Sequence, residues 1–151
     1  AGAPAARRTA HGVTTVGEAW RETEVAFRRA RLHYGHGTQN ARDEAAWLVC
    51  SVAGVPFDDL GASLGRTLPP GAVRRIRSVA AKRIERREPL AYLLNEAWLG
   101  PHRFYVDRRV IVPRSFIAEL LPDALRPWLS RRPIRSILDL CTGSGCLAIL
   151  A

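Results

Sequence analysis

Apolar side chains recur every three or four residues over the first part of the chain, which is the spacing of one helix face. Capping residues and glycines or prolines punctuate this pattern. It predicts three helices, from about residue 15 to the glycines of residues 35–37, from residue 41 to Gly54, and from Pro70 to residue 88. Because short helices are stabilised mainly by packing their apolar stripes together, residues 12–88 are predicted to form a small helical domain.

The pattern changes near residue 89. Between residues 97 and 114, aromatic and β-branched residues surround two turn signals, Gly100-Pro101 and Asp107-Arg108. Pro113 is expected to end the last strand, since proline cannot donate to a β-ladder. We therefore predict a β-hairpin linker over residues 89–114, followed by a helix at about residues 115–128.

The last part of the chain combines two apolar runs with a stretch of small residues between them. This order predicts a buried strand over residues 134–141, a glycine turn, and a helix that opens at Ser144, which is how a cofactor-binding α/β domain begins. A parallel strand needs neighbouring strands and flanking helices. Residues 115–151 are therefore expected to start a truncated Rossmann-like domain, and the chain, which contains no Met, is expected to be a fragment of a longer protein.

The expected fold class is thus mixed α and α/β. A helical bundle comes first, a β-hairpin linker follows, and the chain closes on the first strand-loop-helix of the truncated domain. Residues 1–11 are small and basic and lack the apolar segment of a signal peptide, so we expect a disordered tail there.

Charge changes the picture only in part. The net charge is +9, and 22 of the 23 basic residues are Arg, which pairs bidentately with phosphate. A ribosomal RNA contact is one interpretation. The other is a set of solvated helix faces in an Ala- and Arg-rich chain, because the Arg residues are interspersed with Glu and Asp.

Several classes of protein are disfavoured by the remaining composition. The three Cys form no CxxC pair and lie in apolar surroundings, which favours a reducing, cytoplasmic setting. No apolar run reaches the roughly 18 residues of a membrane helix, so we expect no membrane contact. We also expect no metal site, because His33 and His36 have no second ligand pair.

The small residues 141–145 mark where a ligand can approach the backbone, and Asp139 can accept hydrogen bonds from an ammonium or a hydroxyl group. A helix cap, or a strand-end carboxylate that faces solvent, is the alternative for Asp139. Residues 143–148 also fit G-x-G-x-x-A, the dinucleotide pattern, so an NAD-dependent oxidoreductase stays open. Phe104 and Tyr105 either line a substrate slot or pack the hairpin against the helical domain.

Several stretches of the chain, in register over about residues 14–151, resemble the protein-glutamine N-methyltransferases that modify translation proteins. They are most similar to the branch that acts on large-subunit ribosomal protein three. The stretches are Tyr34-Gly35-His36-Gly37-Thr38 with Asn40, Asp43, Glu44 and Ala45; Pro89-Leu90-Ala91-Tyr92-Leu93; Phe104-Tyr105-Val106-Asp107 with Val110; Val112-Pro113-Arg114-Ser115-Phe116-Ile117; and Ile137 to Cys146, where Cys141 replaces a Gly common in the other branch.

The resemblance implies binding of S-adenosylmethionine at Asp139, Cys141, Thr142, Gly143, Ser144 and Gly145. It also implies methylation of a glutamine amide on a ribosomal protein, with residues 12–88 recognising the substrate and with Phe104, Tyr105 and Arg114 as candidate substrate contacts. The family's Asn-Pro-Pro-Tyr motif has no counterpart in the chain, so we assign no catalytic residue and expect the fragment itself to be inactive. A non-catalytic basic helical module that binds ribosomal RNA remains a further alternative.

Overall fold

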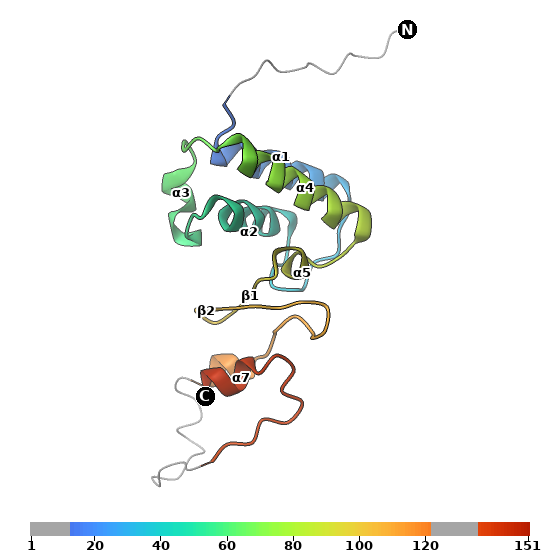
Figure 1. The fold of residues 1–151 in the computed structure, drawn as a ribbon, viewed down its shortest axis with the longest axis vertical. Helices are drawn as coiled ribbons and strands as arrows, with labels where there is room; N and C mark the ends of the chain where they lie inside the picture. The colour runs from blue at the N-terminus through green and yellow to red at the C-terminus, as the bar shows by residue number, and fades with distance from the viewer. Residues whose placement is uncertain (1–12, 122–135) are drawn as a thin grey trace.

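The computed structural model describes residues 13–121 and 136–151. Its first part is a helical bundle (Figure 1). The elements of the bundle are α1 (Val16–Arg29), α2 (Ala41–Ala53), the 3-10 turn η1 (Phe57–Asp59), α3 (Leu60–Ser63), α4 (Pro70–Arg86) and α5 (Leu90–Leu94). Helices α1, α2 and α4 all pack against one another, and α5 packs against α2 and α4.

The ends of the helices follow the capping chemistry of the sequence. At α1, the Thr15 hydroxyl accepts from the Glu18 backbone N–H at 3.2 Å, and the Glu18 carboxylate accepts from the Thr15 backbone N–H at 2.8 Å. Asn40 caps α2 through the Asp43 backbone N–H, at 2.9 Å, and Gly54 ends that helix in the left-handed conformation at φ +62°. These boundaries confirm the predicted start of α1 and both ends of α2.

The first helix ends earlier than the sequence predicts. We expected it to reach residues 34–37, but α1 stops at Arg29, and Arg31 turns the chain at φ +47°. A buried contact explains the early stop: Leu32 enters the core, and the carbonyl of His33 accepts a hydrogen bond from Arg83 at 2.8 Å. This tertiary contact outweighs the helical propensity of the segment.

The hairpin predicted around Gly100-Pro101 is confirmed. Strands β1 (Ala97–Leu99) and β2 (His102–Phe104) pair antiparallel, with Trp98 opposite Arg103. At the second turn signal, the Val110 backbone N–H donates to the Asp107 carbonyl at 3.2 Å, but no strand follows at residues 110–112. The sheet among the described residues is therefore this two-stranded ladder.

The core runs from the bundle into the hairpin region. Phe27, Leu48 and Val49 are fully buried in the bundle. Leu90, Ala97 and further residues up to Val112 belong to the same apolar cluster. Residues 89–114 consequently pack against the helical bundle (Figure 1).

The expected buried strand over residues 134–141 is not formed in its described part. Residues 136–139 have no strand pairing, and the side chains of Ile137 and Leu138 are exposed. No strand of residues 13–121 lies beside them to complete a parallel ladder, and an unpaired strand leaves its backbone groups without partners. The predicted strand was wrong for the described residues, because a strand needs neighbouring strands to pair its backbone groups.

Two short helices complete the described structure. They are α6 (Ile117–Leu120) and α7 (Cys146–Leu150), which pack against each other on the side of the hairpin away from the bundle (Figure 1). Helix α7 starts two residues after the predicted Ser144. The predicted helix over residues 115–128 is described only up to residue 121, and the predicted tail of residues 1–11 lies outside the described residues.

The described residues therefore combine helices with a small antiparallel sheet, a mixed α and β structure. Among residues 13–121 and 136–151, no single helix is long and apolar enough to span a membrane. Ala41–Ala53 and Phe57–Ser63 reach that length and composition only together, across a bend of 102°.

Candidate functional site

The predicted ligand loop, residues 139–145, is a tight turn that depends on left-handed backbone positions. Cys141, Gly143 and Gly145 have φ values of +60°, +58° and +76°. The Gly145 backbone N–H donates to the Thr142 carbonyl at 2.9 Å and closes the turn. Glycine adopts this conformation without strain, so the two glycines account for the shape of the loop.

Asp139 enters this loop with one carboxylate oxygen that lacks a partner. Its Oδ2 is buried and makes no hydrogen bond within the described part of the chain. A buried acceptor without a donor is unfavourable by about 1–3 kcal/mol. The site is therefore suited to a ligand that brings an N–H or O–H group to Asp139.

A hollow of about 320 Å³ lies between the loop after the hairpin and the glycine loop. It is lined by Tyr105, Val106, Asp107, Arg109, Val110 and Ser144. Gly143 also lies near the residue that follows this lining, since an added Cβ there would stand 3.9 Å from Cγ2 of Ile111. The fold thus brings two segments about 40 residues apart into one candidate site.

Asp107 and Arg109 form the polar wall of this hollow. Arg109 Nη2 donates to Asp107 Oδ2 at 2.7 Å, and its Nε is 3.0 Å from both carboxylate oxygens. The Arg109 backbone N–H donates to Oδ1 at 3.0 Å. These bonds from Arg109 lower the pKa of Asp107 to about 2, so the pair stays ionised near neutral pH.

Ser144 and Tyr105 are the predicted site residues that the structure brings together. Ser144 is half-buried, with its Oγ 3.0 Å from the Cys146 sulfur. Tyr105 is exposed, and its hydroxyl donates to Asp107 Oδ2 at 3.4 Å. Cys141 and Thr142 are exposed, and neither lines the hollow.

Phe104 and Arg114 stand apart from this hollow. Phe104 is half-buried and pairs with Ala97 in the hairpin ladder, and Arg114 is exposed beyond the loop. Sequence reasoning missed Asp107 and Arg109 as site residues. The sequence did contain a signal for these two residues. The predicted turn at Asp107-Arg108 brings Asp107 and Arg109, two positions apart, to the same side of the chain.

Glu96 anchors the hairpin that carries this site. Its Oε1 accepts from Trp47 Nε1 at 2.7 Å and from Trp98 Nε1 at 3.0 Å, and its Oε2 accepts from Ser51 at 3.3 Å. Arg103 on β2 lies 3.6 Å from the same carboxylate. One buried carboxylate therefore joins α2 to both strands of the hairpin. No group of three or more metal-ligating side chains occurs among residues 13–121 and 136–151.

A comparison with known protein families concerns the helical bundle that carries the hairpin. The chain belongs to the PrmC N-terminal domain family, which matches residues 19–94. The match runs from within α1 to the end of α5.

Individual relatives agree with the resemblance to the branch that acts on large-subunit ribosomal protein three. Proteins named ribosomal protein uL3 glutamine methyltransferase are 49% identical in Burkholderia pseudomallei, over 91% of this chain and 45% of the relative, and 52% identical in Bordetella pertussis, over 81% and 41%. The relative of that name in Neisseria meningitidis serogroup A is 45% identical, over 94% and 47%. The chain spans about half the length of the curated relatives it matches.

Proposed function

We propose that this chain forms part of an enzyme that transfers a methyl group from S-adenosylmethionine to a glutamine side-chain amide of ribosomal protein uL3. The observation that carries the proposal is the similarity to uL3 glutamine methyltransferases over most of the chain. The names of these relatives support methyl transfer over an NAD-dependent oxidoreductase and over a non-catalytic RNA-binding module. A cytoplasmic setting is part of the same proposal.

The cofactor would be held by the glycine loop, Asp139 and residues 141–145, as the first elements of a Rossmann-like domain. The fit rests on two features: the buried Oδ2 of Asp139 has no donor among residues 13–121 and 136–151, and the loop turns tightly at Gly143 and Gly145. The methionine ammonium and the ribose hydroxyls of the cofactor are donors of the kind that Asp139 lacks. When bound, S-adenosylmethionine supplies the methyl group on its sulfonium.

The hollow beside Tyr105 would receive the substrate segment. An amide nitrogen is a weak nucleophile, so the side chain must be oriented before transfer. Tyr105, Val106 and Val110 offer an apolar wall for the methylene groups of a glutamine, and the ionised Asp107 lies at its polar side. Phe104 and Arg114 remain predicted substrate contacts, and the helical bundle remains the predicted substrate-recognition domain.

A chimera tests the proposal directly. In it, this chain replaces the matching region of the Burkholderia pseudomallei relative. We expect the chimera to transfer a tritiated methyl group from S-adenosylmethionine to uL3, with the label on a glutamine by mass spectrometry. We expect the 151-residue chain alone to transfer none, because it lacks the Asn-Pro-Pro-Tyr motif. A folded chimera without activity, beside an active relative, would refute the assignment.

The glycine loop is tested separately by calorimetric titration of the chimera with S-adenosylhomocysteine. Gly143→Val should abolish binding, because Gly143 has a φ of +58°, a conformation that β-branched residues avoid, and its Cβ would face Ile111. The matched control is Gly65→Val, where an added Cβ meets no atom within 4 Å and φ is not positive. Unchanged affinity in Gly143→Val would remove the loop from the cofactor site.

A further inference from the structure

A stripe of uncompensated positive charge runs along α4. Arg75, Lys82 and Arg86 are exposed and stand seven and four residues apart, which places them on one face of the helix. The stripe is about 17 Å long at 1.5 Å per residue. None of the ion pairs among the described residues involves these three side chains, whereas Arg77 and Arg83 of the same helix pair with Glu22 and Glu44.

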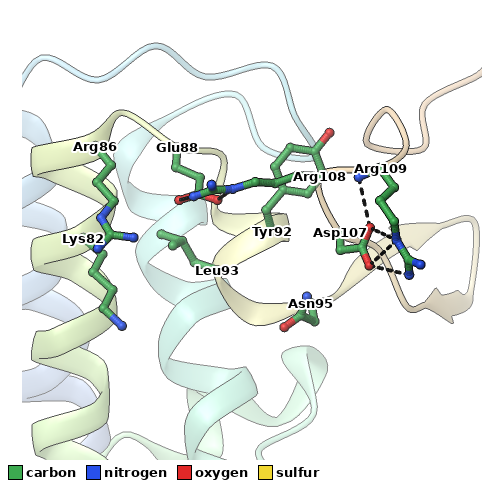
Figure 2. A pocket seen from close by; sticks show the side chains of 9 residues that line it. All are labelled: Lys82, Arg86, Glu88, Tyr92, Leu93, Asn95, Asp107, Arg108 and Arg109. Atoms are coloured by element: carbon green, nitrogen blue, oxygen red, sulfur yellow. Dashed lines mark hydrogen bonds and ion pairs between the residues drawn. The ribbon is translucent and has the colours of Figure 1, made fainter.

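The stripe leads into a second hollow, of about 440 Å³, at the end of α4. Lys82 and Arg86 project into it from α4, opposite the segment of residues 107–109 (Figure 2). Two carboxylates also line it, and each is held by an arginine: Glu88 by Arg108, with both bonds at 2.6 Å, and Asp107 by Arg109. The hollow therefore keeps a positive excess that resides on Lys82 and Arg86.

An aromatic and an apolar side chain line the hollow between these charges. Tyr92 and Leu93 are half-buried and line the hollow between α4 and the loop (Figure 2). The Tyr92 hydroxyl donates to the Val110 carbonyl at 2.7 Å, which fixes the ring. Asn95 donates its amide N–H to the Val106 carbonyl at 3.1 Å, so its carbonyl oxygen is left to accept from a ligand.

We infer that α4 and this hollow bind a single-stranded segment of RNA. Its phosphates lie on the stripe of Arg75, Lys82 and Arg86, and one base enters the hollow against Tyr92. An acidic peptide would also satisfy the cations. Each nucleotide, however, combines a phosphate with a stacking ring that can carry N–H donors, and this combination suits the cations, the Tyr92 ring and the Asn95 carbonyl together. Asp107 and Arg109 line both hollows, so the bound RNA lies directly beside the candidate methylation site.

The inference rests on the proposed function only for the identity of the RNA, which would be the ribosomal RNA that the substrate protein accompanies. Binding itself needs no cofactor and no methyl transfer. It can therefore be measured on the 151-residue chain, and a failure there leaves the chimera assay valid as a test of the proposed function. An inactive chimera, in turn, leaves the RNA measurement valid.

The experiment is fluorescence anisotropy of a labelled oligouridylate, titrated with the chain over a range of salt concentrations. The double variant Lys82→Ala/Arg86→Ala should lose more than about tenfold in affinity at low salt. Its slope of log affinity against log salt should fall by about 1.4, since each lost phosphate contact on a single strand contributes about 0.7. Both side chains are exposed and outside the ion pairs, so the fold should persist by circular dichroism.

The matched control is Arg21→Ala/Arg29→Ala on α1, which removes the same charge from exposed positions outside both hollows. It should change affinity less than about twofold. Equal losses in the two double variants would overturn the inference, because net charge alone would then explain binding. Competition by polyglutamate as strong as that by polyuridylate, at equal charge, would overturn it in favour of an acidic protein partner.

Discussion

At the scale of single residues, the core contains an ion pair that the rest of the bundle encloses. Arg83 Nε donates to Glu44 Oε1 at 3.0 Å, and both side chains are at most 5% exposed. Burial raises the pKa of Glu44, and the bonds from Arg83 oppose that rise. Arg83 also donates to the His33 carbonyl, so it fixes the segment between α1 and α2.

Removal of one partner should therefore be costly. Arg83→Met would leave the Glu44 carboxylate buried without a counter-charge, which destabilises proteins by about 3–5 kcal/mol. The folded-state pKa of Glu44 should rise further, above its unfolded value, so the loss should be largest at neutral pH and shrink as pH falls through the raised pKa. Urea unfolding at neutral and mildly acidic pH measures this, with Arg75→Met as the exposed control. A pH-independent loss would contradict it.

The pair of half-buried Asp107 and exposed Arg109 depends on pH in the opposite direction. The bonds from Arg109 lower the pKa of Asp107 from 3.8 to about 2, so the interaction is fully present above the unfolded value and is lost as pH falls toward the folded one. Carbon-13 NMR of the Asp107 carboxyl, followed against pH, should give a pKa of about 2. Arg109→Gln should return the pKa toward 3.8, whereas Arg114→Gln should leave it in place.

At the scale of elements, the hairpin is held by polar bonds to a helix as well as by its own ladder. Glu96→Ala would leave the Trp47 indole N–H buried without an acceptor, a cost of about 1–3 kcal/mol. We expect a lower free energy of unfolding and faster hydrogen exchange in β1 and β2. Glu85→Ala, on the exposed side of α4, is the control. Unchanged exchange in the hairpin would show that Glu96 does not anchor it.

Elements that local chemistry determines were predictable from the sequence. The capping residues Thr15 and Asn40, the left-handed Gly54 and the turn at Gly100-Pro101 all act within a few positions of themselves. The stop of α1 at Arg29 was not predictable, because it depends on Arg83, which binds the His33 carbonyl from 50 positions away.

The same limit applies to the candidate site. The glycine loop is visible in the sequence because glycines mark positive φ values, and the structure has Gly143 and Gly145 in that conformation. The approach of Ser144 to Tyr105 depends on tertiary structure, which no local sequence pattern predicts. The strand over residues 134–141 failed for a related reason, since the apolar pattern predicts a strand only where a partner strand exists.

At the scale of the whole molecule, the bundle and the hairpin region share one core, whereas the region beyond it is open. Leu90, Val106 and Val112 are at most 2% exposed within the cluster that also contains the bundle. In contrast, Phe116 is 83% exposed and Leu138 is 79% exposed. Further exposed apolar side chains lie within residues 111–120 and 137–149. They are Ile111, Ile117, Leu120, Ile137, Leu140 and Ile149.

Three chain lengths should separate these two regions. Residues 12–114 should melt cooperatively and remain monomeric, because they keep the shared core and lose most of the apolar side chains that invite association. Residues 12–88 should also melt cooperatively but at lower temperature, since each of Leu90, Val106 and Val112 contributes about 1.5–3 kcal/mol by burial.

The 151-residue chain should self-associate in light scattering. Equal melting temperatures for the two shorter chains would contradict the shared core, and a monomeric 151-residue chain would contradict the role of the exposed apolar side chains.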